Sequence, residues 1–143
     1  MILISNRGNL NGPNPDFENK QDYIQVAINK GYNVKIDLWL KDGKLYLGSD
    51  SPQYELDIDW LSRNNSKVWI QCRDIELLER LIELDPLGSN LNIFTYNGEV
   101  TLTSKCYIWG NESEDSIALL GPKTDEEEFD YNGICSDHIE NYG

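Results

Sequence analysis

Polar and charged side chains follow two apolar stretches of the chain, at the positions where α/β proteins usually carry their reactive groups. The stretch "LISNRGN" ends an expected strand with Asn6 and Arg7, and "LYLGSD" ends another with Ser49 and Asp50. Loops that follow strands commonly carry binding and catalytic residues. These two loops are therefore the first candidates for a functional site.

Two further expected strands carry polar side chains on a single face. "NVKIDLWL" alternates with period two, which places Lys35, Asp37 and Trp39 on one face of the strand. "VWIQCR" likewise places Gln71 and Arg73 on one face. Phosphate recognition needs cationic donors that make several hydrogen bonds and does not need a metal. A common interior lined by these faces would therefore suit a phosphorylated ligand.

Strands alternate with helices in the first half of the chain, which predicts parallel βα units. One helix is expected from Asn19 to Gly31, with Tyr23, Val26 and Ala27 on one face. The clearest helix, "DIELLERLIEL", is expected to bury Ile75, Leu78, Leu81 and Ile82. The second half holds short strand candidates with little room for helices. The predicted fold is α/β: a compact, trimmed TIM-like (β/α) barrel with few helices in its C-terminal half.

Composition narrows the class of protein. A chain of 143 residues fits one domain over residues 1–143, and 39% apolar content with 10% aromatics is too high for disorder. No apolar run reaches the roughly 20 residues that span a bilayer, and no export signal opens the chain. We therefore expect a soluble, cytoplasmic protein without a membrane partner. A net charge of −13 argues against binding nucleic acid. The sequence carries no signal that sets the oligomeric state.

Four short motifs occur in a recognisable order: "NRG", then "EN" at Glu18 and Asn19, then "KID", then "GSD". This order resembles the glycerophosphodiester phosphodiesterase family of the phosphatidylinositol-phospholipase-C-like superfamily. That family carries His-Arg-Gly, Glu-Asn, Glu-x-Asp and His-Asp at comparable spacing on a (β/α) barrel. The likeness is strongest over residues 1–55. "WIQCRD", "VTLTSK", "YIW" and "GICSD" extend it along the chain, as in short viral or bacterial members.

The departures from the family pattern fall on its catalytic positions. In the family, two histidines act as general acid and base, and the Glu and Asp of Glu-x-Asp hold a divalent metal. The corresponding residues here are Asn6, Ser49, Lys35 and Asp37, so the resemblance leaves only Asp37 in place. Tyr96 lies near the position of another family histidine.

Asn and Ser cannot replace the acid–base pair unaided, and each lost group costs on the order of 10²–10⁴ in rate. A lysine at the position of a metal-binding Glu would repel a cation, so neither a metal nor another cofactor is expected. The cations Arg7, Lys35 and Arg73 remain, with Lys105 following in "TLTSK". Trp109, which ends a strand just before Gly110, is a further candidate for contact with a ligand.

These observations predict a catalytically inactive, phosphodiesterase-like protein that binds and sequesters a small phosphorylated or nucleotide-like molecule. Two alternatives stay open. One is an active, metal-independent phosphodiesterase that uses Lys35 as a base. The other is an acidic protein-interaction domain in which Lys35, Asp37 and Arg73 only plug the barrel. The predicted ligand-binding residues are Asn6, Arg7, Lys35, Asp37, Ser49, Asp50, Gln71, Arg73, Tyr96, Lys105 and Trp109.

Overall fold

The computed structural model describes residues 1–85, 90–124 and 130–143. Its strands are β1 (Ile2–Asn6), β2 (Asn33–Lys41), β3 (Lys44–Leu47), β4 (Tyr54–Glu55), β5 (Val68–Cys72), β6 (Asn92–Phe94), β7 (Thr101–Leu102), β8 (Ile108–Trp109), β9 (Ser116–Leu120) and β10 (Gly133–Ser136). Its helices are α1 (Gln21–Asn29), α2 (Ile58–Arg63), α3 (Ile75–Leu84) and the 3₁₀ turn η1 (Ile139–Asn141).

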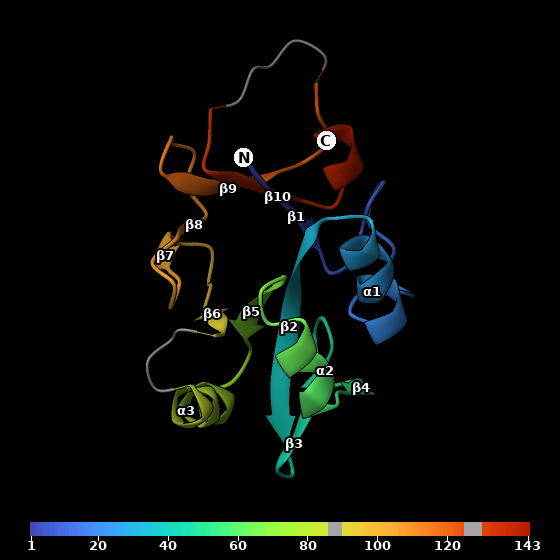
Figure 1. Cartoon of the computed structure of the whole chain (residues 1–143), viewed down its shortest axis with the longest axis vertical. Coiled ribbons are helices and arrows are strands. Elements are labelled where there is room, and N and C mark those ends of the chain that lie inside the picture. The colour runs from blue at the N-terminus through green and yellow to red at the C-terminus, as the bar shows by residue number, and fades with distance from the viewer. Residues whose placement is uncertain (86–89, 125–129) are drawn as a thin grey trace.

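All of these strands belong to one mixed sheet that curls around the long strand β2 (Figure 1). Neighbouring strands are parallel in the order β6–β5–β2–β1–β10–β9–β8. Antiparallel partners extend the sheet, because β3 pairs with β2 and β4, and β7 pairs with β8. The sheet thus forms an open half-barrel.

The prediction of a TIM-like barrel is wrong. Among the described residues only three short helices accompany the sheet, and the sheet is a curled, mixed half-barrel rather than a ring of alternating strands and helices. The connection from β8 to its parallel neighbour β9 spans only residues 110–115. A parallel crossover that includes a helix needs about a dozen residues or more, so this connection has no room for one.

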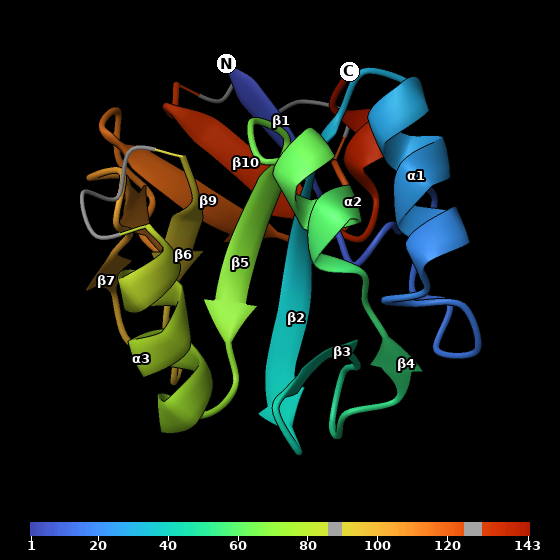
Figure 2. The same cartoon turned by 60° about the horizontal axis from the view of Figure 1, so that its bottom comes forward.

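The helices lie on the outer face of β2 and β5, as Figure 2 shows. Val34, Ile36 and Leu38 point to that face and are fully buried in the larger hydrophobic core. The alternate residues of β2 point into the curl of the sheet. There a second, largely aromatic cluster packs around Trp69, Phe94 and Trp109. The strands therefore have two buried faces, and the inner one carries the polar residues.

Helix α1 begins later than predicted, at Gln21, because Asn19 adopts a left-handed conformation with φ of 67°. The helix buries Ile24 and Ala27, whereas Val26 is 50% exposed. The predicted face was therefore only partly correct.

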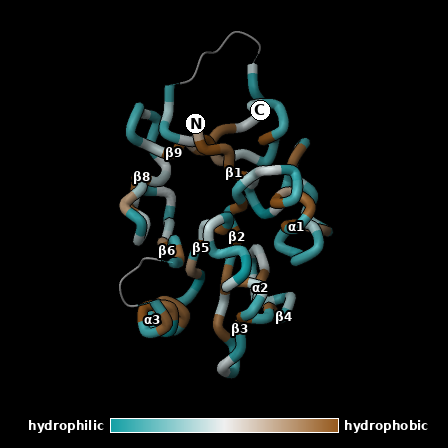
Figure 3. Tube along the Cα trace, in the orientation of Figure 1, coloured by the Kyte–Doolittle hydropathy of each residue, from teal (hydrophilic) through white to brown (hydrophobic). Residues whose placement is uncertain are grey.

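Helix α3 also turns a different face to the sheet. It buries Leu77 and Leu81, which are four residues apart, while the predicted core residues Ile75 and Ile82 are 66% and 52% exposed. Hydrophobic positions in Figure 3 consequently lie on more than one side of this helix. No helix in the described ranges is long and apolar enough to cross a membrane.

Candidate anion-binding site

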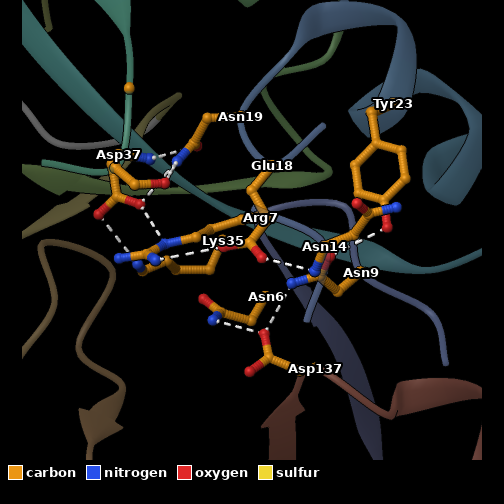
Figure 4. A network of polar contacts seen from close by, with 12 residues as sticks. Asn6, Arg7, Asn9, Asn14, Glu18, Asn19, Tyr23, Lys35, Asp37 and Asp137 are labelled. Carbon is orange, nitrogen blue, oxygen red and sulfur yellow. Dashed lines mark hydrogen bonds and ion pairs between the residues drawn. The ribbon is translucent and has the colours of Figure 1, made fainter. Parts of the chain in front are cut away.

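Asp37 lies at the centre of a buried cluster of cations on the inner face of the sheet. Its side chain is 0% exposed, and Lys35 Nζ donates to its Oδ1 over 3.0 Å. Arg7 Nε donates to Oδ2 over 2.8 Å, and Arg73 Nη1 donates to Oδ1 over 3.4 Å. Asn19 Nδ2 adds a fourth bond, to Oδ2, over 2.9 Å (Figure 4). These four donors match the roughly four lone-pair sites of a carboxylate.

The backbone holds Arg7 and Asn19 in place through strained conformations. Both residues have positive φ, 61° for Arg7 and 67° for Asn19; this region is uncommon for Arg, whereas Asn adopts it more readily. Asn19 N donates to the carbonyl oxygen of Arg7 over 3.1 Å, and Arg7 N donates to that of Lys35 over 2.8 Å. Such strain concentrates at functional sites, where the surrounding structure enforces it.

Arg73 and Glu18 complete the cluster from two sides. The guanidinium of Arg73 lies 5.3 Å from the centre of the Trp39 ring, whose Nε1 donates to the carbonyl oxygen of Gly48 over 2.7 Å. Glu18 accepts from Arg7 Nη1 over 3.4 Å and from the backbone N–H of Asn14 over 2.7 Å. Each arginine is thus held by more than one contact.

The ionisation of the cluster follows from burial and charge. Burial raises the pKa of Asp37, but Lys35, Arg7 and the Asn19 hydrogen bond together outweigh it and hold the pKa below its ordinary value. Burial lowers the pKa of Lys35; Arg7 adds to this effect, and Asp37 offsets only part of it. For Arg7, burial opposes the charged form, yet Asp37 and Glu18 raise the pKa above its ordinary value. Asp37 is therefore a carboxylate and Arg7 a guanidinium at neutral pH.

A cavity of about 480 Å³ opens beside this cluster, and we call it the cationic cavity. It lies against the ends of β1, β2, β5, β8, β9 and β10. Its lining consists of Asn6, Arg7, Lys35, Gln71, Arg73, Tyr96, Trp109, Leu119, Leu120, Cys135, Ser136 and Asp137. Three cationic side chains thus gather at one cavity of a strongly acidic protein.

Two lining residues keep unused hydrogen-bonding groups. The indole Nε1–H of Trp109 is buried and has no hydrogen-bond partner in the described part of the chain. Gln71 is only 6% exposed, and its amide makes no hydrogen bond to any described residue. Buried polar groups are nearly always hydrogen-bonded, so the Trp109 indole is an exception among the described residues, whereas the Gln71 amide keeps contact with solvent at the cavity.

A second polar network borders the cavity near the end of β10. Asp137 Oδ1 accepts from Asn6 Nδ2 over 2.8 Å and from Asn9 Nδ2 over 2.9 Å. Asn9 Oδ1 in turn accepts from the hydroxyl of Tyr23 over 2.9 Å. This network fixes Asn6 at the rim and places one carboxylate, that of Asp137, on the cavity wall (Figure 4).

The structure brings most of the predicted site residues to this place. Lys35 Nζ and Arg73 Nη1 bond the same oxygen of Asp37, at 3.0 and 3.4 Å. Tyr96, which follows β6, and Trp109, which ends β8, line the same cavity. The predicted residues at the cationic cavity, or bonded to its cluster, are Asn6, Arg7, Lys35, Asp37, Ser49, Gln71, Arg73, Tyr96 and Trp109.

Ser49 lies at the edge of the cluster, and Asp50 and Lys105 have other surroundings. Ser49 reaches the cluster only indirectly, as the acceptor of a 3.0 Å bond from Asn19 Nδ2. Asp50 is exposed and is absent from the described lining of the cavity. Lys105 lies elsewhere, in a small cavity of about 120 Å³ together with Ile2, Asn33 and Val68 at the amino ends of their strands.

Sequence reasoning missed the supporting residues. Asn19 and Glu18 bond Asp37 and Arg7, and Asp137 forms part of the wall. The signal for Asn19 and Glu18 was present in the "EN" motif. Asp137 directly follows β10, and the carboxyl ends of parallel strands are where such residues gather.

The carboxylates are not arranged as a metal site. No group of three or more His, Cys, Asp or Glu side chains in residues 1–85, 90–124 and 130–143 could hold a metal ion. Both oxygens of Asp37 already accept bonds from two donors each. A metal would have to displace at least one fixed cation from Asp37.

Comparisons of the chain with protein-family models, with curated proteins and with solved structures found no match. The function is therefore argued from the site itself.

Proposed function

We propose that this protein binds a small phosphorylated or nucleotide-like anion in the cationic cavity and does not cleave it. The observation that carries the proposal is the convergence of Arg7, Lys35 and Arg73 on a cavity whose lining also includes the unbonded amide of Gln71. A phosphate with several acceptor oxygens would use both kinds of group.

The cations have donors to spare. Lys35 has three N–H donors and gives one to Asp37, while each arginine has five N–H donors and gives one to Asp37. Arg7 gives one more to Glu18. Charge-assisted bonds to phosphate are about twice as strong as neutral ones. The remaining donors can therefore bind an anion while Asp37 keeps the side chains oriented.

The charges at the site also favour an anion. Arg7, Lys35 and Arg73 line the cavity together with one carboxylate, that of Asp137, while Asp37 and Glu18 pair with these cations and do not line it. Because the chain carries a net charge of −13, a cavity whose nearby charges balance is less negative than the protein as a whole.

The arrangement of the cluster argues against cleavage. The family that the chain resembles carries two histidines, a Glu and an Asp at its catalytic positions, and only the Asp is retained here, as Asp37. Four donors already occupy the oxygens of Asp37. Asn6 donates to Asp137 and Ser49 accepts from Asn19, so neither side chain acts as a proton-transfer group.

A second candidate is a purely structural role for the ion pairs. Its support is that Asp37 is 0% exposed and fully bonded, as expected of an internal plug. This alternative does not explain why the unbonded amide of Gln71 lines the cavity. It also predicts that anions do not bind here.

The test is the stabilisation of the protein by inorganic phosphate, followed by thermal melting and by calorimetric titration. Wild type should melt at a higher temperature as phosphate is added. Arg73→Ala should bind phosphate at least about tenfold more weakly, because a bond to a charged group contributes about 1.5–3 kcal/mol. The matched control is Arg63→Ala, which removes an exposed arginine from the last turn of α2 and should change nothing.

No stabilisation up to about 50 mM phosphate, a concentration that would reveal even millimolar binding, would overturn the proposal. Equal phosphate affinity in wild type and Arg73→Ala would overturn the assignment of the site.

A further inference from the structure

A second cavity adjoins the cationic cavity and shares three of its wall residues, Gln71, Arg73 and Tyr96. We call it the side cavity; its volume is about 510 Å³. The two spaces are therefore neighbours that share part of their lining. A ligand larger than a phosphate ion can extend from one into the other.

The side cavity has different chemistry. Apart from the shared residues, its polar lining comes from Thr95, Asn97, Glu99 and Thr101 around β6 and β7. These side chains offer hydroxyl and amide groups and a single carboxylate, with no cation beyond the shared Arg73. Like charges brought together cost free energy, so Glu99 disfavours a second anionic group here. The lining suits an uncharged part of a ligand that can hydrogen-bond.

Gln71 connects the two spaces. It is 6% exposed, lines both cavities, and makes no hydrogen bond within the described residues. A neutral amide offers two N–H donors and one acceptor oxygen. Its position at the junction fits the point where a phosphate group meets the neutral part of the same molecule.

We propose that the ligand places one phosphate in the cationic cavity and an uncharged hydrogen-bonding portion in the side cavity, and that Glu99 selects against a second phosphate there. This inference rests on the proposed function, because it needs the phosphate site. The inference assigns Glu99 a role in specificity. It also states that the ligand carries phosphate at one end only.

The test compares three probes by calorimetric titration: inorganic phosphate, adenosine 5′-monophosphate and adenosine 3′,5′-bisphosphate. The monophosphate should bind wild type more tightly than inorganic phosphate does, and Gln71→Leu should remove much of that difference. Glu99→Gln should strengthen the bisphosphate by about three- to tenfold, as expected for one exposed like charge. It should leave inorganic phosphate, which occupies the cationic cavity alone, within about twofold of wild type.

The matched control is Glu79→Gln, which removes an exposed carboxylate from α3, away from both cavities. It should leave the binding of all three probes unchanged. An equal effect of Glu99→Gln and Glu79→Gln on the bisphosphate would overturn the role of Glu99. A monophosphate that binds no better than inorganic phosphate would overturn the side cavity as part of the site. If wild type did not bind inorganic phosphate at all, this result would instead overturn the proposed function.

Discussion

Replacing Lys35 with methionine separates the ligand-binding account from that of a purely structural plug. Lys35 Nζ lies 3.0 Å from Asp37 Oδ1, and its side chain is 7% exposed. Methionine keeps most of the apolar stem and removes the ammonium. Both accounts therefore predict lower stability, but only the ligand account predicts weaker binding of phosphate.

The size of the effect follows from the partners that remain. Leaving a buried charge without any partner costs about 3–5 kcal/mol. Asp37 would keep Arg7 and Asn19 on Oδ2 and Arg73 on Oδ1, so the loss is closer to that of one hydrogen bond to a charged group. We expect the free energy of unfolding to fall by about 2 kcal/mol. At roughly 3 °C per kcal/mol, the melting temperature should fall by about 6 °C.

Urea unfolding followed by tryptophan fluorescence measures this change, and phosphate titration of the same variant measures binding. The control is Lys44→Met, because Lys44 is 61% exposed and lies 3.7 Å from Glu55 across the β3–β4 pair. The control should cost less than about 0.5 kcal/mol. Unchanged stability in Lys35→Met would refute the argument that this ion pair is structurally important. Lost stability with unchanged phosphate affinity would favour the plug.

Three further predictions concern the same site. The protein should not hydrolyse glycerophosphodiesters or an aryl phosphodiester, with or without Mg²⁺ or Ca²⁺; a metal-stimulated rate that disappears in Asp37→Ala would contradict this. Because the pKa of Asp37 is below its ordinary value of 3.8, its contribution to stability is complete above pH 3.8 and is lost as the pH falls through the lower, folded-state pKa. The acid slope of the unfolding free energy should therefore be shallower in Asp37→Asn than in wild type. Gly48→Ala would press a Cβ against the carbonyl oxygen of Ser51 and should cost about 1–3 kcal/mol in urea unfolding. Gly121→Ala meets no atom within 4 Å and should stay within about 0.5 kcal/mol of wild type.

The polar faces of the strands were predictable because strand alternation is a geometric property of the backbone. Period two alone put Lys35 with Asp37 and Gln71 with Arg73, and all four lie at the same cluster or cavity. The hairpin turn at "KDGK" has a local cause as well, because Asp-Gly favours two-residue hairpin loops, and Lys41 pairs with Lys44 across this turn.

The barrel and the helix faces were not predictable in the same way. Whether a sheet closes depends on contacts between distant strands, and the expectation of a TIM-like barrel came largely from the family resemblance. The face that a helix buries depends on where it packs, so α3 buries Leu77 and leaves Ile75 exposed although both are apolar. Local pattern identified this helix but not its orientation.

The supporting residues of the site show a similar limit. Lys105 follows a short strand and resembles a site residue in sequence, yet it lies near the amino ends of β1 and β2. Asn19 is a residue type that often begins a helix as its N-cap. Here its side chain instead donates to Asp37, and its backbone adopts a left-handed conformation. Partners distant in the chain determine both placements, and local propensity does not include them.

The most direct test of the central claim is a crystal structure of the wild-type protein soaked with phosphate. The account predicts an anion in the cationic cavity, within about 3 Å of nitrogen atoms of at least two of Arg7, Lys35 and Arg73. It also predicts that the anion or a water bound to it accepts a hydrogen bond from the amide of Gln71. Water alone in this cavity at high phosphate concentration, with all three cations bonded to Asp37 as before, would contradict the account.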